Sequence, residues 1–93
     1  GIADRRIVSL TQKHVRGRLA EALLHLVDVY GIDSEGILSA QISREDMASL
    51  SNMTTSNAIR TLSEFADEGM LAVHGRTIKF VDMKRLERTS LYG

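Results

Sequence analysis

The sequence predicts a mainly α-helical domain with one small β-hairpin, and three features support this fold class. Residues 15–30 carry apolar side chains at steps of three and four, which is typical of an amphipathic helix. Residues 42–69 hold two short helical patterns separated by a turn. Residues 71–81 are rich in β-branched and aromatic side chains and are interrupted by a glycine, which favours a hairpin. We therefore expect helices first and a hairpin near the C-terminus.

Length and composition limit the chain to one small domain. It has 93 residues, of which 43% are hydrophobic and 26% are charged, and its 12 basic and 12 acidic side chains cancel. The absence of cysteine excludes a disulfide scaffold, a thiolate metal site and a cysteine nucleophile. No apolar run approaches the ~20 residues that span a bilayer, and no signal peptide is visible. We therefore expect a cytoplasmic protein that does not contact a membrane.

The first half of the chain is expected to be helical. Residues 2–13 have a partial apolar face, and the apolar stripe of residues 15–30 is interpreted as core packing. Gly31 follows the stripe and is well placed to end the helix. Residues 37–42 alternate apolar and polar side chains, which predicts a short strand.

The middle of the chain carries the start and stop signals of two helices. Ser43 is the expected N-cap of a helix over residues 44–50. Thr54 is the expected N-cap of a second helix over residues 55–68. Asn52 falls in the turn between them, where asparagine tolerates a positive φ better than most residues.

The end of the chain predicts a hairpin and a last short helix. Strands are expected over residues 71–73 and 76–81, with His74-Gly75 as the turn. Asp82 is placed to cap a helix that runs through Arg88. The complete order of elements describes a winged helix-turn-helix, in which the hairpin is the wing.

The helix over residues 55–68 has the two faces that a DNA-reading helix needs. Its apolar side chains share one face, while small polar groups and one arginine share the other. Short side chains at the helix start let the backbone approach base edges, and an arginine can reach guanine O6 and N7 with two hydrogen bonds. The residues that we expect to read bases are Thr55, Ser56, Asn57 and Arg60.

Phosphate contacts are expected from basic and hydroxyl side chains around this helix. Basic residues cluster near both ends of the chain, at Arg5, Arg6, Lys13, Arg16 and Arg18 and again at Arg76, Lys79, Lys84, Arg85 and Arg88. A locally positive surface can therefore exist on a neutral protein. The predicted phosphate-contacting residues are Arg16, Arg18, Ser43, Arg44, Thr54, Ser63, His74, Arg76 and Lys79.

Three stretches of the chain resemble the C-terminal DNA-binding domain of the Crp/Fnr family of bacterial transcription regulators. They read VRGRLAEALLHL, ISREDMASLSNMTTSNAIRTL and GMLAVHGRTI, and their order and spacing agree with the family over about two thirds of the chain. The resemblance implies that residues 1–13 are the tail of a dimerisation or linker helix. It implies that residues 14–93 are the winged helix-turn-helix that binds DNA, with the helix over residues 55–68 in the major groove.

The resemblance also implies partners. Regulators of this kind carry an N-terminal effector domain and bind two-fold-related operators in double-stranded DNA as homodimers, and RNA polymerase is a further candidate partner. No cofactor is expected within this chain. Many members have arginine and glutamate where this sequence has Thr55 and Ser56, so the usual half-site of the family is not expected here.

Two other functions are weaker. The 3 histidines fall on separate elements without ligand spacing, and no nucleophile motif is visible, so neither a metal site nor an enzyme is expected. The alternative is a winged helix that contacts proteins and does not bind DNA, which the neutral charge and the acidic end of the helix over residues 55–68 favour.

Overall fold

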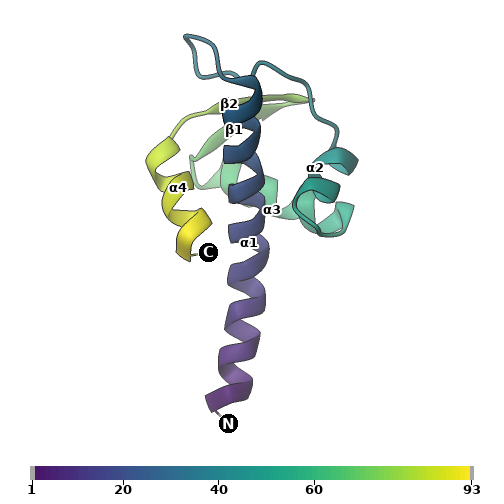
Figure 1. Ribbon diagram of the computed structural model, residues 1–93, viewed down its shortest axis with the longest axis vertical. Helices are drawn as coiled ribbons and strands as arrows, with labels where there is room; N and C mark the ends of the chain where they lie inside the picture. Colours follow the sequence, from purple (N-terminus) through teal and green to yellow (C-terminus); the bar gives the residue numbers. More distant parts are fainter. Residues whose placement is uncertain (1, 93) are drawn as a thin grey trace.

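The structure is a computed structural model that describes the backbone of residues 2–92 and the side chains of residues 15–92. Four helices and two strands occur in this part of the chain (Figure 1). Their order is α1 (Ile2–Tyr30), α2 (Arg44–Leu50), α3 (Thr55–Asp67), β1 (Leu71–His74), β2 (Thr77–Phe80) and α4 (Met83–Tyr92). The mainly helical architecture with one antiparallel hairpin confirms the predicted fold class.

Helix α1 is one continuous element of 29 residues, which joins the two helical segments predicted before and after residue 14. Its first half extends away from the rest of the molecule, and this gives the chain its length of 48 Å against 25 and 23 Å (Figure 1). The helix ends where predicted, because the Gly31 N–H closes the last turn on the Val27 carbonyl at 2.8 Å. The side chains of Arg5, Arg6, Lys13 and His14 lie outside the described residues.

The helix-turn-helix forms where the sequence places it. Ser43 caps α2 by accepting the Asp46 N–H at 3.1 Å, and Thr54 caps α3 by accepting the Asn57 N–H at 3.1 Å. Asn52 turns the chain between the helices with a φ of 56°. Both predicted caps are therefore confirmed, and the start of α3 is fixed in position.

The hairpin is shifted by one residue from the prediction. β1 pairs with β2 from Leu71↔Phe80 to His74↔Thr77, so the turn consists of Gly75 and Arg76, and the predicted turn at His74-Gly75 is wrong. The left-handed φ that a tight two-residue turn requires falls on Gly75, at 61°. Glycine at this first turn position explains the shift.

The strand predicted over residues 37–42 is also wrong, because only its first two residues make β-type contacts. Ile37 forms an isolated bridge with Lys79, and the Leu38 N–H donates to the Ile78 carbonyl at 2.9 Å. Gly36 comes so close to β2 that an added Cβ would lie 3.0 Å from the Phe80 carbonyl oxygen. The loop before α2 is thus fastened to the outer edge of the hairpin.

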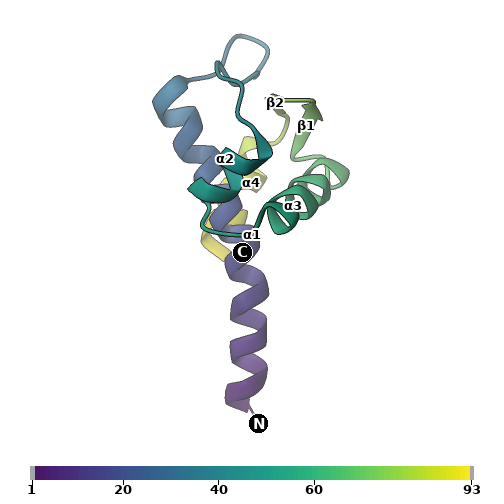
Figure 2. The ribbon, with the colours of Figure 1, turned by 90° about the vertical axis from the view of Figure 1, so that its right-hand side faces the viewer.

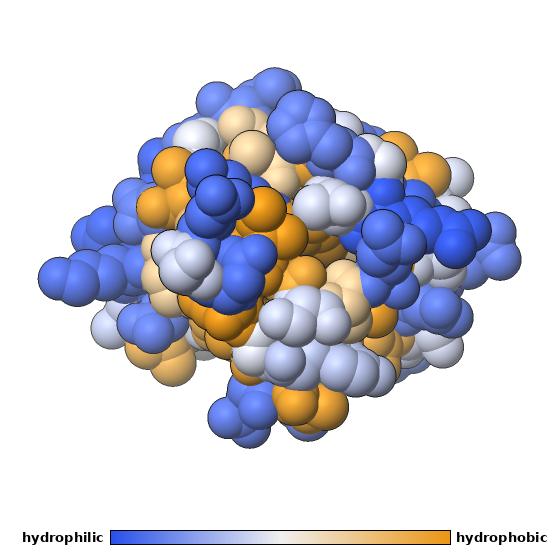
Figure 3. All heavy atoms as spheres, turned by 90° about the horizontal axis from the view of Figure 1, so that it is seen from above, coloured by the Kyte–Doolittle hydropathy of each residue, from blue (hydrophilic) through white to orange (hydrophobic). Residues whose placement is uncertain are grey.

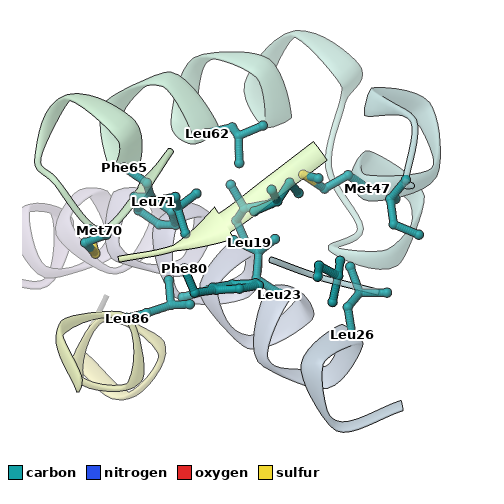
Figure 4. Close-up of a cluster of buried hydrophobic side chains, with 14 residues drawn as sticks. Leu19, Leu23, Leu26, Met47, Leu62, Phe65, Met70, Leu71, Phe80 and Leu86 are labelled. Atoms are coloured by element: carbon teal, nitrogen blue, oxygen red, sulfur yellow. The ribbon is translucent and has the colours of Figure 1, made fainter. Parts of the chain in front are cut away.

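The core lies where α1, α3, the hairpin and α4 meet (Figure 4). Leu19 and Leu23 of α1 pack against Phe65 of α3, and Met70 and Leu86 close the side next to α4. α4 begins at its predicted cap, where the Arg85 N–H donates to the Asp82 Oδ1 at 3.1 Å, and it extends to Tyr92, four residues beyond the predicted Arg88. None of the helices in the described part of the chain is long and apolar enough to cross a membrane.

Candidate nucleic-acid interface

The N-terminal half of α3 presents the predicted base-reading residues to solvent. Thr55, Ser56 and Arg60 are exposed and Asn57 is half-buried. The Arg60 Nη2 donates a hydrogen bond of 2.7 Å to the Asn57 Oδ1. This bond links two of the four predicted base readers and gives the guanidinium a defined direction.

The opposite face of α3 anchors the helix. Ala58, Thr61, Leu62 and Phe65 are buried against the core, which leaves the polar face on the outside. Ala48 of α2 is also buried, with 3% of its surface exposed. Buried packing on one side and polar groups on the other fix which side chains of α3 can touch a ligand.

The hairpin carries three of the predicted phosphate contacts. His74, Arg76 and Lys79 are all exposed. Lys79 alternates with buried Ile78 and Phe80 on β2, so its side chain points away from the core. Arg76 lies in the turn itself. The hairpin is therefore a cationic projection beside α3.

A cleft of about 300 Å³ lies between α3, β1 and the first residue of α2. Arg44 and Ser63, both predicted to contact phosphate, line this cleft together with Asp67. The caps Ser43 and Thr54 lie at the starts of α2 and α3, where helix N–H groups lack backbone partners. The cleft brings Arg44 and Ser63 together beside Val73 of the hairpin, with the carboxylate of Asp67 among them.

Arg16 has a different setting from the other predicted contacts. Its Nη1 donates to the Glu64 Oε1 at 2.9 Å, and its Nη1 and Nη2 donate to the two oxygens of Glu68 at 2.9 and 2.8 Å. The guanidinium also lies 5.1 Å from the centre of the Phe65 ring, within cation–π range. Arg85 of α4 completes the network through the Glu68 carbonyl at 2.8 Å and the Glu68 Oε1 at 3.3 Å.

This network joins α1, α3 and α4 at the C-terminal end of α3. The hydrogen bonds from Arg16 lower the pKa of the Glu68 carboxyl, and the bonds to Glu68 raise the pKa of Arg16. The network was not predictable from the sequence, because Arg16 lies 48 and 52 residues from its partners and a single sequence carries no signal for contacts at that separation. The Asn57–Arg60 pair has the visible spacing of helix neighbours, three residues, and could have been expected.

Arg18 of α1 contacts the helix-turn-helix directly. Its Nη1 donates to the Asn52 carbonyl at 3.1 Å, so the side chain reaches the turn between α2 and α3. Among residues 15–92, no group of three His, Asp or Glu side chains is arranged to hold a metal ion. The sites of interest are therefore the polar start of α3 and the cationic groups around it.

Residues 17–89 match the family of Crp-like helix-turn-helix domains. The chain belongs to this family. Every predicted contact residue except Arg16 falls within the matched part of the Crp-like domain.

Regulators from several bacteria are similar to this Crp-like domain. The CRP-like cAMP-activated global transcriptional regulator of Mycobacterium tuberculosis is 26% identical over 87 residues, which are 91% of this chain and 39% of that protein. A transcriptional regulator of the CRP/FNR family from Thermus thermophilus has a TM-score of 0.77 and 25% identity, over 98% of this chain and 48% of that one. The CO-dependent transcription factor CooA of Carboxydothermus hydrogenoformans has a TM-score of 0.75 and 29% identity, over 90% and 40% of the two chains.

The chain spans less than half the length of these relatives. The family match and the similar regulators support a DNA-binding output domain. The geometry of α3 and the hairpin then suggests how such a domain contacts its DNA.

Proposed function

We propose that this Crp-like domain reads double-stranded DNA with the N-terminal half of α3 in the major groove and the hairpin against the backbone. The observation that carries the proposal is the exposed polar start of α3, where Arg60 is held by Asn57 and the opposite face is buried. A helix supported in this way can enter the groove without losing its packing on the core.

Arg60 is proposed as the main base reader. Its guanidinium has five N–H donors, and the bond to Asn57 uses only one of them. The remaining donors suit the O6 and N7 acceptors of guanine. Asn57 has a dual role in the proposal, since it orients Arg60 and offers an amide to a neighbouring base, while Thr55 and Ser56 reach base edges at the start of the helix.

Phosphate contacts are proposed for the groups that surround α3. The set consists of Arg18, Ser43, Arg44, Thr54, Ser63, His74, Arg76 and Lys79. Arg16 was also predicted to contact phosphate, but its bonds to Glu64 and Glu68 suit it better to holding α1 against α3. We therefore assign Arg16 a positioning role in this proposal.

The proposal extends to a longer regulator, because the similar proteins are more than twice as long as this chain. In it, residues 1–13 continue a dimerisation or linker helix, and residues 14–93 are the DNA-binding unit. Two such units in a homodimer would bind a two-fold-related operator in the cytoplasm, with half-sites about one helical turn apart. RNA polymerase remains a candidate partner of this longer protein, and the domain itself has no proposed enzymatic role.

The structure weakens one of the observations that favoured the alternative, a winged helix that contacts proteins and does not bind DNA. It relied partly on the acidic end of α3, but Glu64 and Glu68 are bound by Arg16, and Arg85 adds a second cation to Glu68. Two of the three carboxylates at this end are therefore engaged within the domain, while Asp67 is exposed.

A salt-dependent anisotropy titration of the domain against a random pool of duplex DNA, followed by selection of the tightest binders, tests the proposal. We expect an enriched motif and a slope of log affinity against log salt of about −0.9 per phosphate contact. Flat salt dependence with no enriched motif would overturn the DNA proposal and favour the protein-contact module. A steep slope without enrichment would contradict base reading by the isolated domain.

A further inference from the structure

A groove runs between α1 and α2, away from the start of α3, and it meets the proposed DNA interface at Arg18. Two hollows form it, of about 540 and 320 Å³, and both are lined by His25 of α1 and Leu50 of α2. The first hollow extends towards Arg18 and Asn52, and the second extends towards Tyr30. Because they share two lining residues, the hollows make one continuous groove along the pair of helices.

The walls of this α1–α2 groove expose apolar side chains. Val29 is 57% exposed, Tyr30 is 52% exposed and Leu50 is 51% exposed, and all three line the groove. These apolar side chains gather along one groove, where a partner could cover them together. Viewed from above, the end of the molecule where α1 stops also shows hydrophobic atoms gathered within a hydrophilic surround (Figure 3).

The charges beside the groove are mainly negative. Glu21 of α1 and Asp46 of α2 line its two walls, and Asp28 lies about two helical turns beyond Glu21 on α1. The chain from Leu19 to Ser43 contains no lysine or arginine and four carboxylates. Arg18 is the cation at the end near Asn52, and its Nη1 donates to the Asn52 carbonyl. An apolar floor with carboxylates on both walls complements a cationic partner.

The groove lies on a different side of the domain from the DNA interface. In Figure 2 the last turns of α1 and α2 are on one side, while α3 and the hairpin are on the other. An occupant of the groove therefore does not compete with DNA for the start of α3. Away from Arg18, the carboxylates on the walls repel phosphate, so the apolar middle of the groove does not suit nucleic acid.

We propose that the α1–α2 groove is a docking site for one amphipathic helix of a partner protein, with apolar residues on its inner face and lysine or arginine along its flanks. A helix suits the site because its apolar residues, spaced three and four apart, fill a groove between two helices. Leu50 contacts the apolar face at the middle of the groove, and Glu21 and Asp46 pair with the flanking cations. This surface is an addition to the proposed DNA-binding function.

The test is an NMR titration of the ¹⁵N-labelled domain with a synthetic peptide of roughly four helical turns. The peptide carries leucine at helical spacing and lysine elsewhere, and a second peptide replaces every lysine with glutamate. We expect the lysine peptide to shift the amide signals of both groove walls and the glutamate peptide to bind at least tenfold more weakly.

Three variants decide whether the groove is the site. Leu50→Lys removes the apolar side chain at the centre of the groove, and Glu21→Lys reverses the charge of one wall at an exposed helical position. Each variant should lower the affinity for the lysine peptide about tenfold. Leu91→Lys is the matched control, because Leu91 is 75% exposed on α4 and does not line the groove. Thermal melting verifies that all three variants are folded.

Several results would overturn the proposal. Equal binding of both peptides, equal affinity of all three variants, or shifts that map away from α1 and α2 would each exclude a specific cationic helix. A concentration-dependent dimer that Leu50→Lys dissociates would show that a second copy of the chain occupies the groove. Loss of DNA binding alone would contradict the proposed function and leave the groove proposal intact.

Discussion

Arg60 and Asn57 are joined across one turn of α3 by a hydrogen bond of 2.7 Å from the arginine Nη2 to the asparagine Oδ1. Both side chains belong to the exposed polar face, and the bond restricts the rotamers of a long side chain before any ligand is present. Less conformational entropy is then lost when the guanidinium meets a base. The pair therefore combines a reading group with a support for it.

Replacement of Arg60 should reduce both affinity and selectivity. We expect Arg60→Ala to cost about 1–3 kcal/mol of binding free energy on the selected operator and much less on random duplex. Arg60→Lys keeps the charge but lacks the planar fork, so it should not restore selectivity. Anisotropy titrations on both duplexes measure the effect, and unchanged selectivity in Arg60→Ala would remove Arg60 from the base-reading role.

The support from Asn57 is testable by a double-mutant cycle. Asn57→Ala should weaken operator binding by about 1 kcal/mol, and its effect should shrink when Arg60 is already alanine, because the two residues act as one unit. Binding constants of the parent, the two single variants and the double variant give the coupling energy. Strictly additive losses would mean that Asn57 contacts DNA independently of Arg60.

Lys79 should contribute to DNA binding by contacting phosphate, without reading bases. Its side chain is exposed on β2, so Lys79→Ala should lower the magnitude of the salt slope by about 0.9 and weaken all DNA sequences alike. Lys84→Ala, an exposed lysine on α4 outside the proposed interface, is the matched control. Equal slopes for the parent and Lys79→Ala would place the hairpin lysine away from the DNA backbone.

The sequence allowed correct prediction of the elements that depend on local signals. Ser43 and Thr54 were recognisable as caps because a hydroxyl before a helical pattern satisfies free N–H groups within three residues. The hairpin turn was misplaced by one residue because neighbouring positions share the same residue preferences, and only pairing of the strands fixes the register.

Contacts between distant parts of the chain were not predictable. Nothing in the local sequence links Arg16 to Glu68, whose contact depends on how α1 crosses α3. The same holds for residues 37–42, whose alternating pattern suggested a strand, although only Ile37 and Leu38 reach the hairpin edge. The roles of the polar side chains on α3 in DNA binding are likewise set by the geometry of a complex.

Gly36 should tolerate substitution less well than Gly69. Both have a φ of 82°, so alanine brings a similar backbone strain of about 1–2 kcal/mol at each position. An added Cβ at Gly36 would also lie 3.0 Å from the Phe80 carbonyl oxygen, while the one at Gly69 meets nothing within 4 Å. Chemical denaturation should therefore show a larger loss for Gly36→Ala. Equal losses would mean that the loop moves away from β2 without cost.

Glu68 should make stability depend on pH in the acidic range. Because hydrogen bonds from Arg16 lower its pKa in the folded state below the ordinary 4.5, the unfolded chain takes up the proton more readily. The stabilisation from Glu68 is therefore fully present above pH 4.5 and is lost as the pH falls through the lower folded pKa. Glu68→Gln should cost about 1 kcal/mol at pH 7, since the network is only partly shielded from water.

Urea denaturation of the parent, Glu68→Gln and Glu87→Gln between pH 7 and pH 3 checks this sign. Glu87 is an exposed glutamate on α4 without a part in the network, so its variant should follow the parent curve. The Glu68→Gln curve should lie below that of the parent at pH 7, and the gap between the two curves should narrow as the pH falls below 4.5, because protonation removes the stabilisation from the carboxylate. A constant difference in stability between the parent and Glu68→Gln over the whole pH range would show that the charge of Glu68 does not stabilise the fold. The loss would then come from altered packing or hydrogen-bond geometry of the glutamine side chain.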